Sequence, residues 1–371
     1  MINVNHRIFG LDLLRAIAII KVVIGHGKVL LPKQISYYLS LIPVHGVIAF
    51  FVLSGFLIGR IIIQLFEDRK LTYHLFFFFL VRRWMRTLPA YFFVLFTLIL
   101  FEFIFTNSFT IQDKFFYFLF IQNLNTPHPS FFSVAWSLSV EEWYYLLLPT
   151  LFYIISYTCR LSFKHKALIV CISIILFSTL VRFYKYFTLE EGFNWDYTFR
   201  KQVLTRLDNI AFGFLAAFLD KYYSRFLEKH KNGMLIIGVL IAVFAKVLDK
   251  CNLYANGGLY DCVFWFWLNT LPFFLCLPYL SRLKSNSNNK LARVITFISL
   301  ISYSIYLVHL NIVQHWIVMK ISWACIGVET LRLFLVYGTY WFFTFILAYA
   351  LYKTVEQPFI KLRDRVFVKK V

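Results

Sequence analysis

Arg15 and His26 could act together chemically, although both lie in an apolar stretch near the start of the chain. A helix turns about 100° and rises about 1.5 Å per residue, so eleven residues place the two side chains on one face, about 16 Å apart. Charged groups in a bilayer are costly unless they face protein or water, and the shared face therefore predicts a polar path along this helix. Asp12 offers an alternative for Arg15, because it lies one turn earlier and could pair with it. His26 could alternatively cap the helix end.

Three arginines, Arg82, Arg83 and Arg86, are clustered in the segment LVRRWMRTLPAYF. Guanidinium groups carry a permanent charge and bind phosphate oxygens in pairs, so the cluster is typical of phosphate recognition. Anchoring of the chain at the cytoplasmic membrane surface is the alternative. We expect these residues in a cytoplasmic loop, with an interfacial or re-entrant LFFFFL segment before them and Pro89 near the start of the next span.

Two adjacent acids, Glu141 and Glu142, follow the outer end of another apolar segment. They point to adjacent helix faces, so one can face a cavity while the other faces water or caps the helix. The aromatic residues beside them are Trp136, Trp143, Tyr144 and Tyr145. This set is consistent with a sugar-binding or proton-handling mouth on the outer side, and aromatic anchoring in the membrane interface explains the aromatic residues equally well.

Other polar residues lie at the ends or middles of apolar segments. Ser54 and Gly55 are small residues among bulky ones, which permits close helix packing. Glu356 precedes Pro358 at the end of the last span, where helix termination is an alternative to function. A lone histidine such as His309, in the ninth span, is typical of an interhelical hydrogen bond.

The elements that position these residues are apolar helices. The chain has 371 residues, of which 60% are hydrophobic and 15% charged, whereas soluble domains carry about 25% charged residues. The apolar runs are continuous and long enough to cross a bilayer, so we predict an all-α, polytopic membrane helical bundle and exclude a β-barrel. The ten predicted spans lie near 8–30, 47–66, 88–106, 135–157, 167–187, 203–219, 233–248, 262–280, 294–318 and 332–352.

The formal net charge of +20 is distributed unevenly between alternate loops. Loops on one side contain 23 Lys and Arg residues and those on the other side contain 6. The positive-inside rule therefore predicts that both termini are cytoplasmic. Residues 353–371 form a basic amphipathic tail that should lie on anionic lipid. The first span lacks a cleavage site and should be retained.

The six cysteines form no CxxC pair and show no Cys/His metal spacing, so no metal site is expected. Cys251 and Cys262 flank one predicted external loop, and a disulfide between them is one possibility.

Seven segments together resemble the acyltransferase-3 family of integral membrane proteins, which includes bacterial O-antigen and other envelope-glycan O-acyltransferases. The matching segments, in the usual order of the family, are GLDLLRAIAIIKVVIGH, FFVLSGFLIG, RRWMRTLPAYF, AWSLSVEEWYYLLLP, RLDNIAFG, SYSIYLVHL and EQPF. They cover nearly the whole chain, so residues 1–371 are expected to form a single transmembrane domain of this family without a fused secreted hydrolase-like domain. Many members carry a polar residue where this chain has Ile48.

The resemblance implies a membrane O-acyltransferase of the bacterial inner or plasma membrane, acting on a cell-envelope or lipid-linked glycan with acyl-CoA, most simply acetyl-CoA, as donor. It assigns catalysis to His26 and Arg15, with Glu356 as a further acid and Glu142 as a group that orients the sugar or moves a proton. Donor binding is expected from Arg15, Arg83, Arg86, Ser54 and Gly55. Acceptor binding is expected from Glu141, Trp136 and Tyr144.

Two routes remain open at His26, because its imidazole could act as a general base or accept the acyl group as a nucleophile. A transporter or flippase of a solute or lipid-linked glycan is the alternative function, since such proteins also place charges inside the membrane. The expected partners are acyl-CoA, the glycan and membrane lipid, with no nucleic acid.

Overall fold

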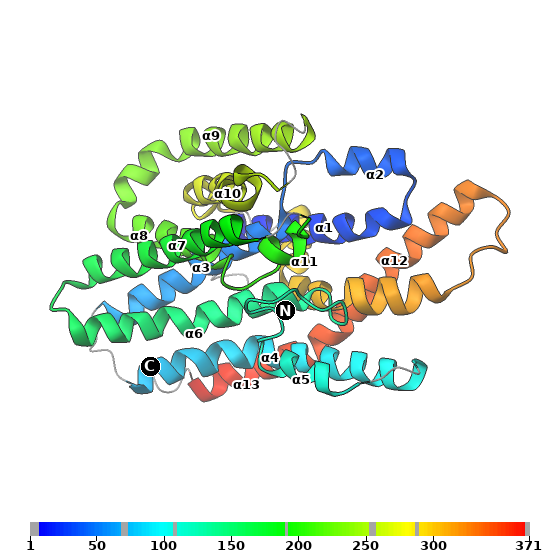
Figure 1. The fold of residues 1–371 in the computed structure, drawn as a ribbon, viewed down its shortest axis with the longest axis horizontal. Coiled ribbons are helices and arrows are strands. Elements are labelled where there is room, and N and C mark those ends of the chain that lie inside the picture. The colour runs from blue at the N-terminus through cyan, green and yellow to red at the C-terminus, as the bar shows by residue number, and fades with distance from the viewer. Residues whose placement is uncertain are drawn as a thin grey trace.

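The computed structural model of the protein describes residues 7–67, 73–106, 110–189, 192–251, 257–285 and 289–367, and within these ranges it contains helices and no strand. The long helices run side by side along the longest axis of the molecule (Figure 1). The helices are α1 (Phe9–Gly27), α2 (Lys33–Ser40), α3 (Gly46–Phe66), α4 (Tyr73–Phe105), α5 (Gln112–Phe118), α6 (Ala135–Thr158), α7 (Phe163–Thr188), α8 (Leu207–Tyr222), α9 (Ser224–Cys251), α10 (Trp265–Leu280), α11 (Lys290–Val308), α12 (Glu329–Leu351) and α13 (Gln357–Phe367).

Each of the ten predicted spans coincides with one of the longer helices, which confirms the polytopic helical bundle. Seven helical segments of the described chain are long and apolar enough to cross a membrane by length and composition. The predicted spans outside this set are α1, α6 and α8. The first two carry charged residues predicted for the site, and α8 has only 16 residues. Two of the three predicted spans outside this set therefore carry residues of the candidate site.

Helix α4 differs from its prediction, because it is one continuous helix of 33 residues rather than a loop followed by a span. The LFFFFL segment and the arginines belong to this helix, and Pro89 lies inside it instead of near its start. Arg83 and Arg86 consequently lie about 15 and 20 Å along the helix from Tyr73. The arginines are tolerated at this depth because they face carboxylates and a polar cavity, described below.

Gly55 sets the close packing of α3 against α8. A Cβ atom at this position would lie 1.9 Å from the carbonyl oxygen of Ile210 and 3.0 Å from the Cα atom of Gly213. Only glycine permits such an approach of two helix backbones. The space that Gly55 leaves open is therefore filled by α8, as close helix packing predicts, and Gly55 does not line the cavity described below, while its role in donor binding stays a prediction.

Helix α1 lies in the interior of the bundle, where it contacts α3, α10 and α11. Its apolar residues such as Ile19 and Val23 are fully buried in the core. The first helix is therefore surrounded by protein on several sides, which is the environment that its polar residues require. The side chain of Cys251 lies outside the described residues, and with it the suggested disulfide to Cys262.

Candidate active site

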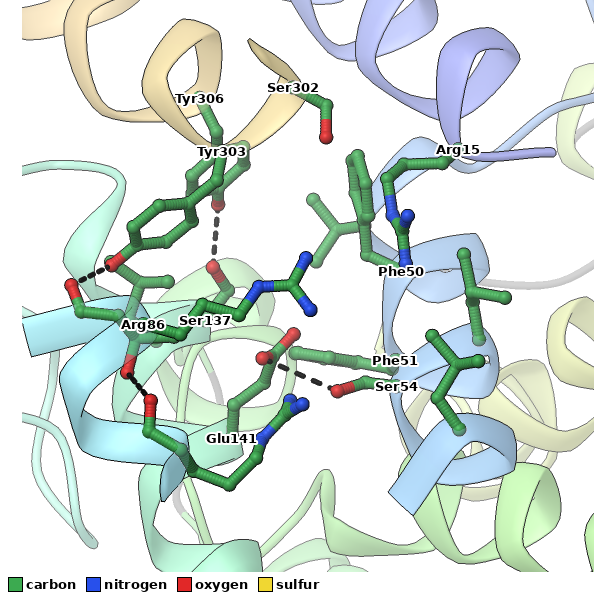
Figure 2. A pocket seen from close by; sticks show the side chains of 16 residues that line it. Arg15, Phe50, Phe51, Ser54, Arg86, Ser137, Glu141, Ser302, Tyr303 and Tyr306 are labelled. Atoms are coloured by element: carbon green, nitrogen blue, oxygen red, sulfur yellow. Dashed lines mark hydrogen bonds between the residues drawn. The ribbon is translucent and has the colours of Figure 1, made fainter. Parts of the chain in front are cut away.

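A cavity of about 100 Å³ lies between α1, α3, α4, α6 and α11. Its walls are apolar around Phe50 and Phe51 but include four charged side chains (Figure 2). The charged residues are Arg15, Arg83, Arg86 and Glu141, and the hydroxyl groups come from Ser54, Thr87, Ser137, Ser302, Tyr303 and Tyr306. Residues predicted separately from four sequence segments therefore meet in one space.

Arg15 faces this cavity because its expected partner, Asp12, is bound mainly by other residues. Asp12 receives a hydrogen bond of 2.9 Å from Nε of Arg7, a second one from Nη2 of Arg7, and one of 2.7 Å from the hydroxyl of Ser299. Nη1 of Arg15 lies 3.7 Å from the Asp12 carboxylate and 3.4 Å from the Ser299 hydroxyl. The predicted pairing of Arg15 with Asp12 is thus present, but it is the weaker contact of that carboxylate.

The two predicted donor-binding arginines differ in their partners. Nη2 of Arg83 donates a 2.9 Å hydrogen bond to the Tyr145 hydroxyl, and its guanidinium lies 4.7 Å from the centre of that ring. Arg86 makes no hydrogen bond or ion pair with any residue that the structure describes, and its guanidinium points into the cavity near that of Arg15 (Figure 2). Two like charges that share a cavity create a site for an anion.

The paired glutamates lie on α6 beside these arginines, and their predicted place in an outer mouth stays a prediction. The Tyr145 hydroxyl donates a 2.6 Å hydrogen bond to Glu141, which also lies 3.5 Å from the Ser54 hydroxyl. Glu142 accepts hydrogen bonds of 3.1 Å from Trp84 Nε1 and 3.0 Å from the Thr87 hydroxyl. Glu141 therefore lines the cavity while Glu142 is held against α4, which confirms their adjacent faces but places both near the donor-side arginines.

Glu356 also belongs to this end of the molecule. It is 2% exposed and accepts a 2.8 Å hydrogen bond from the Ser304 hydroxyl on α11. The positive charges that act on it most strongly are those of Arg86 and Arg15. Glu356 thus places a buried carboxyl group near the arginines, and the helical chain continues past Pro358 into α13, so the alternative of helix termination at this point is wrong.

His26, at the other end of α1, is hydrogen-bonded to a second histidine. Its Nδ1 atom lies 2.7 Å from Nε2 of His309 on the segment that continues α11. Nδ1 of His309 lies 3.0 Å from the carbonyl oxygen of Ile305 and 2.9 Å from that of Tyr306. Tyr306 in turn lines the cavity and its hydroxyl lies 2.6 Å from that of Ser137. The histidine pair is therefore adjacent to the cavity and connected to its wall.

The two predicted aromatic acceptor residues occupy different surroundings. Trp136 packs edge-on against Phe51, with the guanidinium groups of Arg200 and Arg206 within 6 Å of its ring centre. Tyr144 is fully buried in the core near Cys171. It does not line the cavity. Trp136 is also buried, with 4% of it exposed, and does not line the cavity, so neither ring is open to a ligand here.

Arg200 belongs to a short loop helix, Asp196–Arg200, outside the spans. Burial would raise the pKa of Asp196, but hydrogen bonds from Arg200 and Lys201 outweigh burial and lower it. Asp196 therefore stays ionised at neutral pH and partly neutralises Arg200, one of the two cations beside Trp136, together with the neighbouring Lys201.

Several contributors were not singled out from the sequence. Tyr145, which joins Ser54, Arg83 and Glu141, could be read only as one of several aromatic residues, because its partners come from other helices. The prediction of a hydrogen bond between helices for His309 agrees with the structure, but no sequence pattern indicates that its partner is His26. No group of three or more His, Cys, Asp or Glu side chains that could hold a metal ion occurs in the described part of the chain.

Comparison with protein families supports a membrane acyltransferase in general terms. A family model described as an acyltransferase domain matches residues 8–353, which is nearly the whole chain. No curated protein matches the chain, and no solved structure matches it.

Proposed function

The chain belongs to the acyltransferase-3 family, and from this premise we propose that it transfers an acyl group, most simply acetyl, from cytoplasmic acyl-CoA to a hydroxyl of a cell-envelope or lipid-linked glycan. One observation carries the proposal. A single interior helix, α1, brings Arg15 into a cavity with the unpaired Arg86 and brings His26 to a position about 16 Å farther along the same face.

The donor would be held by its phosphate groups between Arg15 and Arg86. Both guanidinium groups face the cavity, and neither has a strong ion pair that a phosphate would have to displace. Charge-assisted hydrogen bonds from guanidinium to phosphate are among the stronger polar contacts in proteins. Arg83 is engaged with Tyr145 and would support the site from its wall. The thioester end of the donor would then extend along α1 toward His26.

The acyl transfer would take place at Nε2 of His26. In the direct route, Nε2 accepts the proton of the acceptor hydroxyl while the oxygen of that hydroxyl bonds to the thioester carbonyl carbon. The carbon–sulfur bond breaks, and the departing thiolate takes up that proton. In the covalent route, Nε2 bonds to the acyl carbon as the thiolate leaves, and the acceptor oxygen then displaces the imidazole and gives its proton to the thiolate. Both routes require an unprotonated Nε2.

The glycan acceptor would approach from the outer side. The partly exposed Arg200 offers a cation at that end, where its guanidinium lies over the ring of the buried Trp136. Glu141 and Glu142 hydrogen-bond near the arginines, so we propose that they support the donor site and do not contact the sugar. A bacterial inner membrane would provide both compartments that this arrangement needs.

The test is a transfer assay with purified protein in lipid nanodiscs. Radiolabelled acetyl-CoA is incubated with lipid-linked glycan extracted from cells that lack the gene, and label in the glycan is measured. Wild-type protein should transfer label, and His26→Ala should transfer none while eluting as the same monodisperse species. Full activity in His26→Ala would refute the role of this histidine.

The same preparation separates the enzyme from the transporter alternative. In proteoliposomes, movement of the glycan across the membrane without acylation would contradict the proposal. Mass spectrometry of envelope glycans from cells with and without the gene identifies the acceptor sugar and the modified hydroxyl.

A further inference from the structure

We infer that His309 is a positioning residue that fixes the tautomer of His26, holding the proton of that imidazole on Nδ1 and leaving Nε2 free to react. The inference rests on the proposed function only in assigning the reaction to His26. The hydrogen bonds that carry it are independent of the substrates.

The two rings have the geometry of a direct hydrogen bond. Their centroids are 5.0 Å apart and their planes are inclined by 18°, while the joined nitrogen atoms are 2.7 Å apart. A short nitrogen–nitrogen distance at that centroid separation means that the rings lie edge to edge in nearly one plane. This is the arrangement in which an N–H bond of one imidazole points at the lone pair of the other.

The backbone of α11 determines which nitrogen of His309 carries its proton. Nδ1 lies within 3.0 Å of two carbonyl oxygens, those of Ile305 and Tyr306, and a carbonyl oxygen can only accept a hydrogen bond. The reverse tautomer would point an unprotonated Nδ1 at both oxygens and lose these contacts inside the protein, where unpaired polar atoms are costly. His309 is therefore protonated on Nδ1, and its Nε2 is an acceptor.

The position of the proton on His26 is determined by the position of the proton on His309. Because Nε2 of His309 accepts, Nδ1 of His26 must donate across the 2.7 Å contact. A neutral imidazole has only one N–H group, so Nε2 of His26 keeps its lone pair. An enzyme histidine is commonly held in its reactive tautomer by the group bonded to its other nitrogen. Here that group is a neutral imidazole fixed by backbone carbonyls.

Exposure separates the roles of the two histidines. His309 is 0% exposed, whereas His26 is partly exposed at the end of α1. His309 also starts the π-helical segment His309–Ile317, a local irregularity that is frequent at functional sites. A fully buried ring cannot reach a substrate, so His309 acts through His26.

The kinetic test compares two substitutions of His309. His309→Leu removes the acceptor and His309→Gln places an amide oxygen near the position of Nε2. We expect the leucine variant to lose about 10- to 100-fold in kcat, the usual range for supporting residues of this kind, with KM for acetyl-CoA and for extracted lipid-linked glycan unchanged. The glutamine variant should recover most of this loss.

His315→Leu is the matched control, because His315 lies exposed on the same π-helical segment. It should leave kcat unchanged. Wild-type kcat in His309→Leu, or a glutamine variant as impaired as the leucine variant, would overturn the inference. If His26→Ala itself retains activity, the proposed site of reaction fails instead, so the two failures are distinguishable.

A spectroscopic readout does not depend on activity or on the folding of any variant of His309. In protein labelled with ¹⁵N-histidine, the His26 signals, assigned by their loss in His26→Ala, should show a protonated Nδ1 and an unprotonated Nε2. A protonated Nε2 in the neutral ring of His26 would refute the assignment even if every variant of His309 were unstable.

Discussion

Arg15, Arg83 and Arg86 reach one cavity from two helices, yet they are not equivalent. Arg83 is bonded to Tyr145, and Arg15 retains a long contact to Asp12, whereas Arg86 lacks a partner among the residues that the structure describes. A guanidinium without a partner has the most to gain from an anionic ligand, because the ligand supplies the hydrogen bonds that the protein does not.

Arg86→Gln should therefore weaken the use of acyl-CoA. A hydrogen bond to a charged group contributes about 1.5–3 kcal/mol, so we expect KM for acetyl-CoA to rise about tenfold or more, with KM for the glycan unchanged. Arg82→Gln is the control, because Arg82 lies on the same helix but outside the cavity lining. Initial-rate kinetics would check this, and an unchanged KM for acetyl-CoA in Arg86→Gln would exclude a phosphate-binding role.

A second charged pair contributes to stability rather than to catalysis. Arg182 and Asp208 are both fully buried and lie 2.6 Å apart, and Arg182 also donates to the carbonyl oxygen of Thr205. Removing one partner of such a pair leaves an uncompensated charge in the interior.

Asp208→Asn should thus lower the free energy of unfolding by about 3–5 kcal/mol. Replacing both residues, in Arg182→Met/Asp208→Leu, should be less damaging than the single change, because the charge of Arg182 is removed together with that of Asp208. Thermal unfolding in detergent at one fixed scan rate measures both variants. A single variant as stable as the wild type would show that the pair is not needed.

At the scale of single residues, the sequence predicted which helix face a side chain lies on better than it predicted which residue that side chain contacts. The shared face of Arg15 and His26 follows from helix geometry alone, and both residues lie where that geometry requires. The partner of His26 lies 283 residues away on another helix, and no spacing rule connects them. The competition between Arg7 and Arg15 for Asp12 was equally hidden, because Arg7 precedes the first residue of α1.

At the scale of helices, the closest packing in the bundle joins α3 and α8. Gly55 and Gly213 face each other, and a Cβ atom on Gly213 would lie 2.0 Å from the carbonyl oxygen of Val52. This contact holds the helix that carries Ser54 at a fixed distance from α8, and so fixes one wall of the cavity.

Gly55→Ala should cost about 1–3 kcal/mol in the free energy of unfolding, because the added methyl group has no room without a backbone shift. Gly338→Ala is the control, since a Cβ atom there meets nothing within 4 Å. Denaturation followed by tryptophan fluorescence gives both values. If the two substitutions have equal effects, the α3–α8 approach is not as close as described.

The sequence predicted the existence of the long helices but misplaced the starts of α4 and α9, the second of which begins at Ser224 instead of near residue 233. Hydrophobic runs identify spans because the bilayer demands them. The start of α4 was not identified by its hydrophobic run, because three arginines interrupt the apolar pattern and resemble an interfacial anchor. Only the tertiary structure, with Tyr145 at Arg83 and a cavity at Arg86, shows why these charges can lie inside a helix bundle.

At the scale of the whole molecule, the loops at opposite ends of the bundle should lie on opposite sides of the membrane. The α6–α7 connection and the segment before α12 are at opposite ends of the long axis (Figure 1). Each carries an exposed free cysteine, Cys159 in the first and Cys325 in the second. The charge distribution predicts the first end to be cytoplasmic.

Single-cysteine variants test this orientation with a membrane-impermeant maleimide. In intact spheroplasts the variant that retains Cys325 should be labelled, while the one that retains Cys159 should be labelled only after permeabilisation. The cysteine-free protein provides the background. Labelling of Cys159 in intact spheroplasts would reverse the predicted topology and with it the direction of acyl transfer.

The ion pair between Arg7 and Asp12 has a practical consequence for handling the protein. Displacing the segment before α1 would return Asp12 to Arg15, which is already 3.7 Å away, and so neutralise one of the cations of the cavity. A bulky fusion partner attached close to Arg7 would then reduce donor binding without touching any cavity residue. Affinity tags are best placed at the opposite terminus, and a fusion protein that appears inactive should first be assayed after the tag has been removed.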